Sequence, residues 1–173
     1  MANSAGILAG SGTSCDWIRP GIMLYGASPY LDQAVSLRPV MSLTAPVIAI
    51  KSLRPGDTVG YGSRWQATEA CNVAVLAIGY ADGYPRQIQA GTSVWLNGQR
   101  ETILGRLSMD MMTISVSSKV LPLIGDRAQL WGKDLSIEEI ARQADSLSYV
   151  LMCGVGPRVA RTYPSPSTVS LES

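Results

Sequence analysis

The stretch that decides the fold is Thr92-Ser93-Val94-Trp95-Leu96-Asn97-Gly98-Gln99-Arg100-Glu101-Thr102-Ile103-Leu104. Two short runs rich in Val, Ile, Thr and Trp flank Asn97-Gly98, a dipeptide that favours the backbone conformations of a tight hairpin turn. Short runs of this kind, separated by Gly, Pro, Asn and Asp, recur from about Leu37 onward. Regularly spaced short strands are typical of closed barrels, so the sequence predicts a mainly β, Greek-key-like barrel with one or two short helices.

The predicted strands and one helix can be placed from the same signals. The strands are Pro39 to Leu53, Ala70 to Ile78, Thr92 to Leu96, Glu101 to Leu104, Met111 to Val116 and Arg127 to Trp131, with a last strand, Val155 to Tyr163, closing the domain. Ser136-Ile137-Glu138-Glu139 is a capping box, in which serine and glutamate satisfy each other's backbone donors. It predicts a helix from Ile137 to about Ser146 whose apolar face packs on the barrel.

The first thirty residues have a different character. Asn3 to Leu8 and Trp17 to Leu24 flank a loop rich in Gly and Ser, and we interpret this strand-loop-strand piece as the end of an α/β (TIM-type) barrel. The Ser/Pro-rich end of the chain predicts disorder. The expected organisation is therefore a barrel remnant over 1–36, a carboxy-terminal β-barrel domain over 37–163 and a disordered tail over 164–173.

Composition narrows the possible functions. The net charge of +1 gives no general attraction to nucleic acid or anionic membranes. The chain has no histidine, and its three cysteines form no CxxC pair, so we expect neither a metal site nor a disulfide. Cys71 and Cys153 lie in apolar runs and are expected to be buried thiols in a reducing compartment. Without a signal peptide or a membrane-spanning run in the sequence, we expect a cytoplasmic protein.

A single tyrosine is the strongest candidate for chemistry. Tyr61 lies in Val59-Gly60-Tyr61-Gly62-Ser63, after a turn signal at Arg54-Pro55-Gly56-Asp57. Flanking glycines permit positive φ angles that direct such a side chain outward. Taken alone, this segment favours an ordinary hairpin tyrosine.

Three further segments give Tyr61 a context. These are Trp17 to Gly26, which contains Arg19-Pro20-Gly21-Ile22, the run Ile78 to Arg86, which contains Gly-Tyr-Ala-Asp-Gly, and Gly105 to Asp110. Together with the tyrosine segment they resemble the carboxy-terminal half of alanine racemases, from about Asn3 to Tyr163. The resemblance implies pyridoxal phosphate as cofactor, an amino acid as substrate, a head-to-tail homodimer and interconversion of L- and D-alanine for peptidoglycan or alanine catabolism.

The resemblance also assigns the cofactor residues. It implies that Ser4 and the Gly21 and Ile22 amides hold the phosphate, and that Arg19 binds the pyridine nitrogen. Because an arginine is always charged, it disfavours protonation of that nitrogen and so limits side reactions such as transamination.

On the substrate side, the resemblance makes Tyr61 the acid/base that removes the Cα proton of L-alanine, acting in the partner subunit's site. A free tyrosine ionises near pH ~10, so a tyrosine base needs positive charge nearby. The resemblance further implies a substrate-carboxylate contact from the Met109 backbone N–H. Corridor and supporting roles are implied for Tyr80, Arg86, Arg106 and Asp110.

Two departures from the family pattern bear on activity. Pro157 stands where many relatives have a tyrosine that contacts the phosphate. No segment matches the motif of the lysine that binds the cofactor covalently, and Lys51, Lys119 and Lys133 are poor substitutes. We therefore expect that the chain alone is inactive and lacks its amino-terminal barrel.

Two alternatives stay open. A related decarboxylase of the same fold type would place an acidic residue against the pyridine nitrogen, which Arg19 speaks against. The other is a non-catalytic β-barrel interaction or dimerisation module that retains the motifs.

Overall fold

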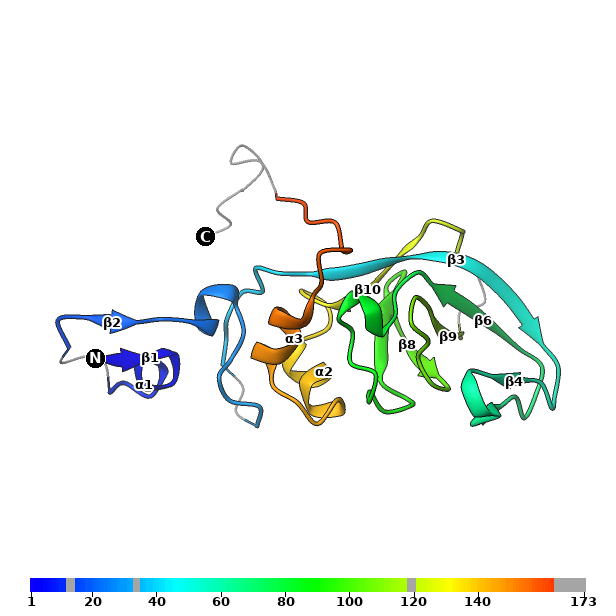
Figure 1. The fold of residues 1–173 in the computed structure, drawn as a ribbon, viewed down its shortest axis with the longest axis horizontal. Coiled ribbons are helices and arrows are strands. Elements are labelled where there is room, and N and C mark those ends of the chain that lie inside the picture. Colours follow the sequence, from blue (N-terminus) through cyan, green and yellow to red (C-terminus); the bar gives the residue numbers. More distant parts are fainter. Residues whose placement is uncertain (12–14, 33–34, 118–120, 164–173) are drawn as a thin grey trace.

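Six antiparallel strands close into the predicted barrel (Figure 1). The computed structural model describes residues 1–11, 15–32, 35–117 and 121–163, so Lys119 and the predicted disordered tail lie outside the described residues. The strand order is β10-β3-β6-β9-β8-β7, and β10 pairs with both β3 and β7 to complete the closure. The strands are β3 (Leu43–Leu53), β6 (Cys71–Leu76), β7 (Ser93–Leu96), β8 (Gln99–Leu104), β9 (Met112–Val116) and β10 (Arg127–Trp131). The fold class and all six of these strands are confirmed.

Alternating burial explains why these runs form a barrel. Along β9 the side chains alternate between buried and half-buried, as expected when one face of a strand points into the barrel. The turn between β7 and β8 has positive φ at Asn97 (49°) and Gly98 (86°). Positive φ at both central residues is what the predicted hairpin turn requires, because it matches the twist of the flanking strands.

Helices α2 (Ile137–Gln143) and α3 (Ser148–Gly154) pack beside the barrel. Helix α2 begins where predicted, with Ser136 Oγ accepting a hydrogen bond from the Glu139 N–H at 3.2 Å. The other half of the predicted capping box is not formed, because the Glu139 carboxylate accepts from Arg100 instead. It ends at Gln143 rather than Ser146, because Asp145 has a φ of 46° that a helix cannot accommodate. Helix α3 was not predicted.

The predicted last strand, Val155 to Tyr163, is wrong. These residues form neither strand nor helix, and the barrel closes through β10 instead. Pro157 has no N–H to donate, and the Gly156 N–H donates to the Asp82 carbonyl at 3.1 Å, so neither can join a ladder. The prediction of buried thiols is also wrong: Cys71 is half-buried and Cys153 is exposed.

The front of the chain forms a small parallel pair, β1 (Ala2–Asn3) and β2 (Ile18–Arg19). A parallel pair fits the interpretation as the end of an α/β barrel. The prediction of a strand over Asn3 to Leu8 is wrong beyond Asn3, which caps helix α1 (Ser4–Leu8) by accepting the Gly6 N–H at 3.0 Å.

The remaining elements are short. The prediction of a strand over Trp17 to Leu24 is correct only for β2, and the 3-10 helix η1 (Ile22–Tyr25) follows. A hairpin of β4 (Thr58–Val59) and β5 (Trp65–Gln66) encloses η2 (Tyr61–Ser63), and η3 (Tyr80–Asp82) follows β6. Figure 1 shows β1 and β2 at one end of the molecule and β4 at the other, with α2 and α3 between them. None of the helices in the described ranges has the length and apolar character needed to span a membrane.

Candidate functional site

Tyr61 points into solvent from the tip of the β4–β5 hairpin. Its exposed fraction is 71%, and it stands between Gly60 and Gly62, whose φ angles are 78° and 72°. The predicted upstream turn is confirmed, since the Asp57 N–H donates to the Arg54 carbonyl at 3.0 Å. The positive φ angles that direct the tyrosine outward thus follow from the glycines, as the sequence predicted.

The hairpin packs against the barrel through Val59. Val59 packs in a small apolar cluster with Val73 and Leu104 of the barrel, and Trp65 covers that cluster. A Cβ placed on Gly105 would lie 2.6 Å from the Val59 carbonyl oxygen, so only glycine allows this approach. The Tyr61 segment and the Gly105–Asp110 segment, 44 to 49 positions apart in the sequence, are therefore in backbone contact.

A second contact joins the Gly-Tyr-Ala-Asp-Gly segment to the same loop. The Tyr80 N–H donates to the Ser108 carbonyl at 3.2 Å, and the Ala81 N–H donates to the Met109 carbonyl at 3.0 Å. Met109 is itself 52% exposed, and its neighbour Asp110 is also exposed. Backbone contacts thus link the three predicted substrate-side segments into one group.

Sequence reasoning missed Arg158 as part of this group. Its guanidinium donates from Nη2 to Asp110 Oδ1 at 2.6 Å, and its Nε lies 3.4 Å from Asp82 Oδ1. The hydrogen bond that Arg158 donates to Asp110, and next the charge of Asp82, raise the pKa of Arg158 above its ordinary value. No local pattern reveals this contact, because 48 positions separate Arg158 from Asp110.

Three arginines gather beside the tyrosine hairpin. Arg64, Arg86 and Arg106 line a cavity of about 710 Å³, whose other lining residues carry no charge. Arg86 also lies over the Tyr80 ring, 5.5 Å from its centroid. Such a cavity has the positive potential that attracts an anionic group.

The predicted cofactor residues come together at the front of the chain. Because β1 and β2 are parallel, Ser4 and Gly21 follow their carboxyl ends at the same edge. Ser4 is buried, and its Oγ accepts the Gly21 N–H at 2.8 Å and the Met23 N–H at 3.5 Å. Ile22 begins η1 beside them, and Arg19 is exposed on β2. All four predicted cofactor residues thus lie on adjoining elements.

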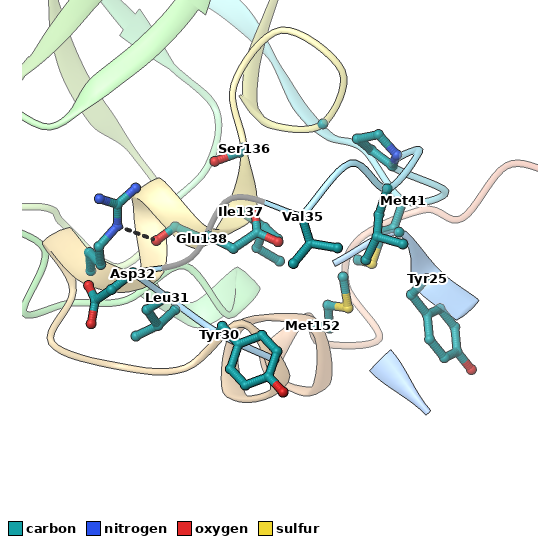
Figure 2. Close-up of a pocket in the computed structure, with 15 residues that line it drawn as sticks. Tyr25, Tyr30, Leu31, Asp32, Val35, Met41, Ser136, Ile137, Glu138 and Met152 are labelled. Carbon is teal, nitrogen blue, oxygen red and sulfur yellow. Dashed lines mark hydrogen bonds between the residues drawn. The ribbon is translucent and has the colours of Figure 1, made fainter. Parts of the chain in front are cut away.

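A second cavity, of about 390 Å³, lies where the front of the chain meets α2 and α3 (Figure 2). The Ser28 N–H donates to Glu138 Oε1 at 2.6 Å, tying the front segment to α2. Arg142 Nε donates to the Glu138 carbonyl at 3.4 Å, the contact dashed in Figure 2. None of the predicted site residues lines this cavity, although Tyr25, the last residue of η1, does.

Comparison with known proteins identifies the family of the chain. Residues 40–163 match the model of the alanine racemase C-terminal domain, and residues 1–29 match that of the alanine racemase N-terminal domain. The chain therefore belongs to the alanine racemase family.

Individual relatives agree with the family models. The chain is 48% identical over 162 residues to the alanine racemase of Nitrosomonas eutropha, covering 92% of this chain and 45% of the relative. Identity to the Nitrosococcus oceani alanine racemase is 47% over 165 residues, covering 94% and 46%.

Solved structures show the same partial coverage. The crystal structure of the biosynthetic alanine racemase from Pseudomonas aeruginosa superposes with a TM-score of 0.88 at 42% identity, covering 95% of this chain and 47% of that one. The Bartonella henselae alanine racemase with covalently bound pyridoxal phosphate superposes with a TM-score of 0.86 at 31% identity, covering 94% and 46%. The chain thus spans about half the length of the relatives it matches.

Proposed function

We propose that this chain is the carboxy-terminal part of an alanine racemase, and that it supplies the tyrosine base and the loop that binds the substrate carboxylate. The observation that carries the proposal is the exposed Tyr61, whose hairpin is fixed against the loop that contains Arg106 and Met109. Family membership supports the reaction class, since the matched relatives are alanine racemases.

The front of the chain suits a phosphate and a pyridine ring. Phosphates bind hydroxyl and backbone N–H groups at the carboxyl ends of barrel strands, and Ser4 and Ile22 carry such groups at one edge, where the Gly21 N–H donates to Ser4 Oγ. Arg19, exposed on β2, is the side chain available to the ring nitrogen. Pyridoxal phosphate would bind here, and when bound it supplies the electron withdrawal that acidifies the Cα proton of an amino acid. One Bartonella henselae relative carries this cofactor covalently.

The separation of the two groups supports a shared site. Arg19 is in β2, and β4 leads directly into Tyr61, and these strands lie at opposite ends of the molecule (Figure 1). One chain cannot bring both groups to one substrate without a large rearrangement. A head-to-tail dimer would place the Tyr61 of each chain beside the cofactor residues of its partner.

In that arrangement each group of this chain has a defined task. Tyr61 takes or returns the Cα proton on one face of the substrate, and the Met109 N–H holds the substrate carboxylate. The arginines of the 710 Å³ cavity bring positive charge beside the Tyr61 hairpin. The proton on the opposite face requires a lysine from the missing barrel, so the chain by itself is expected to be inactive.

The test uses this chain joined to the amino-terminal barrel of the Nitrosomonas eutropha relative. Tyr61→Phe keeps the ring but removes the proton-transfer group, which typically costs about 10²–10⁴-fold in rate. The loss should be asymmetric: Cα proton exchange from L-alanine should collapse, whereas exchange from D-alanine should partly survive.

Tyr149→Phe is the matched control, because Tyr149 is a half-exposed tyrosine of α3. We expect it to retain full activity. Equal rates for Tyr61→Phe and the unmodified chimera would contradict the role of Tyr61, and an unmodified chimera without racemase activity would contradict the proposed function.

A further inference from the structure

The peptide unit that contains the Met109 N–H is fixed in direction by its other end. Its carbonyl belongs to Ser108 and accepts the Tyr80 N–H at 3.2 Å. Because a trans peptide is planar, the Met109 N–H must point opposite to that carbonyl. The next carbonyl, that of Met109 itself, accepts the Ala81 N–H at 3.0 Å. The direction of the Met109 N–H therefore depends on how the loop sits against Tyr80 and Ala81.

The loop packs tightly against the turn at Gly79. A Cβ on Gly79 would lie 2.3 Å from the Met109 carbonyl oxygen, so the two backbones touch. Asp82 locks the same turn, since its Oδ2 accepts the Gly79 N–H at 2.9 Å and its carbonyl accepts the Gly156 N–H at 3.1 Å. The turn over Gly79–Asp82 is thus a rigid support for the loop.

Arg158 joins the support to the loop. It reaches Asp82, which is 9% exposed, with Nε, and Asp110, the residue after Met109, with Nη2. The guanidinium is planar and presents donors in fixed directions, so it can hold two carboxylates at a set spacing. Because about half of the Arg158 and Asp110 side chains is exposed, this contact adds little to stability.

We propose that Arg158 is a positioning residue for substrate binding: by bridging Asp82 and Asp110, it holds the Met109 N–H in the direction that receives the substrate carboxylate. The role in substrate binding rests on the proposed function, whereas the bridge between Asp82 and Asp110 does not.

The first test measures the bridge without any turnover. In Arg158→Met the amides of Tyr80 and Ala81 should exchange with deuterium about two- to fivefold faster than in the unmodified chain, because they are bonded to the loop that the bridge holds. Arg100→Met is the matched control, since Arg100 forms an ion pair with Glu139 at nearly equal side-chain exposure, 49% against 51%. It should leave both amides unchanged.

Asp110→Asn repeats the test with almost no change in size, in case Arg158→Met fails to fold. Unchanged amide exchange at Tyr80 and Ala81 in these variants would contradict the claim that the Arg158 bridge holds the loop. An equal rise in their exchange rates in Arg100→Met would contradict it as well. The exchange measurement tests the Arg158 bridge even if the full-length chimera fails to racemise alanine.

The second test uses the full-length chimera. If the Met109 N–H points in another direction, it binds the substrate carboxylate less well. Arg158→Met should therefore raise the KM for L-alanine about tenfold while kcat changes less than about twofold. Combining it with Asp110→Asn should add little, because both changes break one contact. An unchanged KM, or a loss confined to kcat, would overturn the positioning role.

Discussion

Individual glycines decide whether Tyr61 can reach outward. Gly60 (φ 78°, ψ 177°) and Gly62 (φ 72°, ψ 17°) both have positive φ but differ in ψ, and their surroundings also differ: a Cβ on Gly60 would lie 2.9 Å from the Arg106 nitrogen, whereas Gly62 has nothing within 4 Å. A side chain at Gly62 would meet only the cost of the left-handed conformation, whereas one at Gly60 would combine a backbone conformation almost restricted to glycine with crowding of the loop.

We predict that Gly62→Ala lowers the free energy of unfolding by about 1–2 kcal/mol, the cost of a left-handed alanine. Gly60→Ala should lose about 1–3 kcal/mol more, because its backbone conformation is almost restricted to glycine and the backbone at Arg106 must also move. Urea unfolding followed by tryptophan fluorescence measures both values. Equal losses at the two positions would contradict the additional cost at Gly60.

Tyr84 presents a different residue-scale problem. It is 1% exposed, stacks on Trp131 with ring centroids 6.0 Å apart, and its hydroxyl has no hydrogen-bond partner among the described residues. Burial raises the pKa of Tyr84 above its ordinary value, because the phenolate is poorly solvated there.

The consequence for stability has a definite sign. Above pH ~10 the unfolded chain releases the Tyr84 proton while the folded chain keeps it, so the free energy of unfolding falls as pH rises, by at most about 1.4 kcal/mol per pH unit. Tyr84→Phe should be at least as stable as the unmodified chain at pH 7, and its advantage should grow above pH ~10. A constant difference between pH 7 and pH 11, measured by urea unfolding, would contradict this account.

At the scale of elements, the barrel was predictable and the helical side was only partly so. The β7–β8 hairpin carries its own signals, in the alternation of its strands and in Asn97-Gly98, and its structure follows them. Helix α3 contains Tyr149 and Val150, which favour strands, and it depends on burial of Leu151 rather than on local preference.

The same distinction applies to the site. The glycine-flanked tyrosine can be recognised locally, whereas the Arg158 bridge joins residues that are distant in the sequence. A bridge of this kind becomes visible only when the tertiary contacts are known.

A buried carboxylate ties β8 to β9. Glu101 is 1% exposed and accepts hydrogen bonds from Ser115 Oγ at 2.7 Å, from the Ser117 N–H at 2.9 Å and from Ser117 Oγ at 2.9 Å. Gln99 Nε2 donates to it as well, at 3.0 Å. This network fixes the register of the two strands that lead into and out of the Gly105–Asp110 loop.

We predict that Glu101→Gln destabilises the chain by about 1–3 kcal/mol, because the new amide group faces donors and leaves some of them unpaired. Glu139→Gln, which alters a partly exposed ion pair, should cost about 0–1 kcal/mol. Thermal and urea unfolding of both variants measure the difference. If the two costs were equal, Glu101 would not be the anchor of this strand pair.

At the scale of the whole molecule, the two groups of candidate residues are placed so that neither is complete by itself. The cofactor residues lie on or directly after the small parallel pair, and the tyrosine follows β4 at the opposite end of the molecule (Figure 1). The chain also spans only about half the length of its relatives. Both facts lead to one central claim, that Tyr61 acts in the site of a partner chain.

Complementation in mixed dimers tests that claim most directly. Full-length chimeras with Tyr61→Phe are mixed with chimeras that lack the cofactor lysine of the barrel half, and mixed dimers are purified through two different tags. A head-to-tail mixed dimer has one site with both defects and one with neither, so it should recover about half of the unmodified dimer's activity, although each parent is inactive. If mixed dimers form and stay inactive, Tyr61 and the lysine serve the same subunit's site, and the claim is wrong.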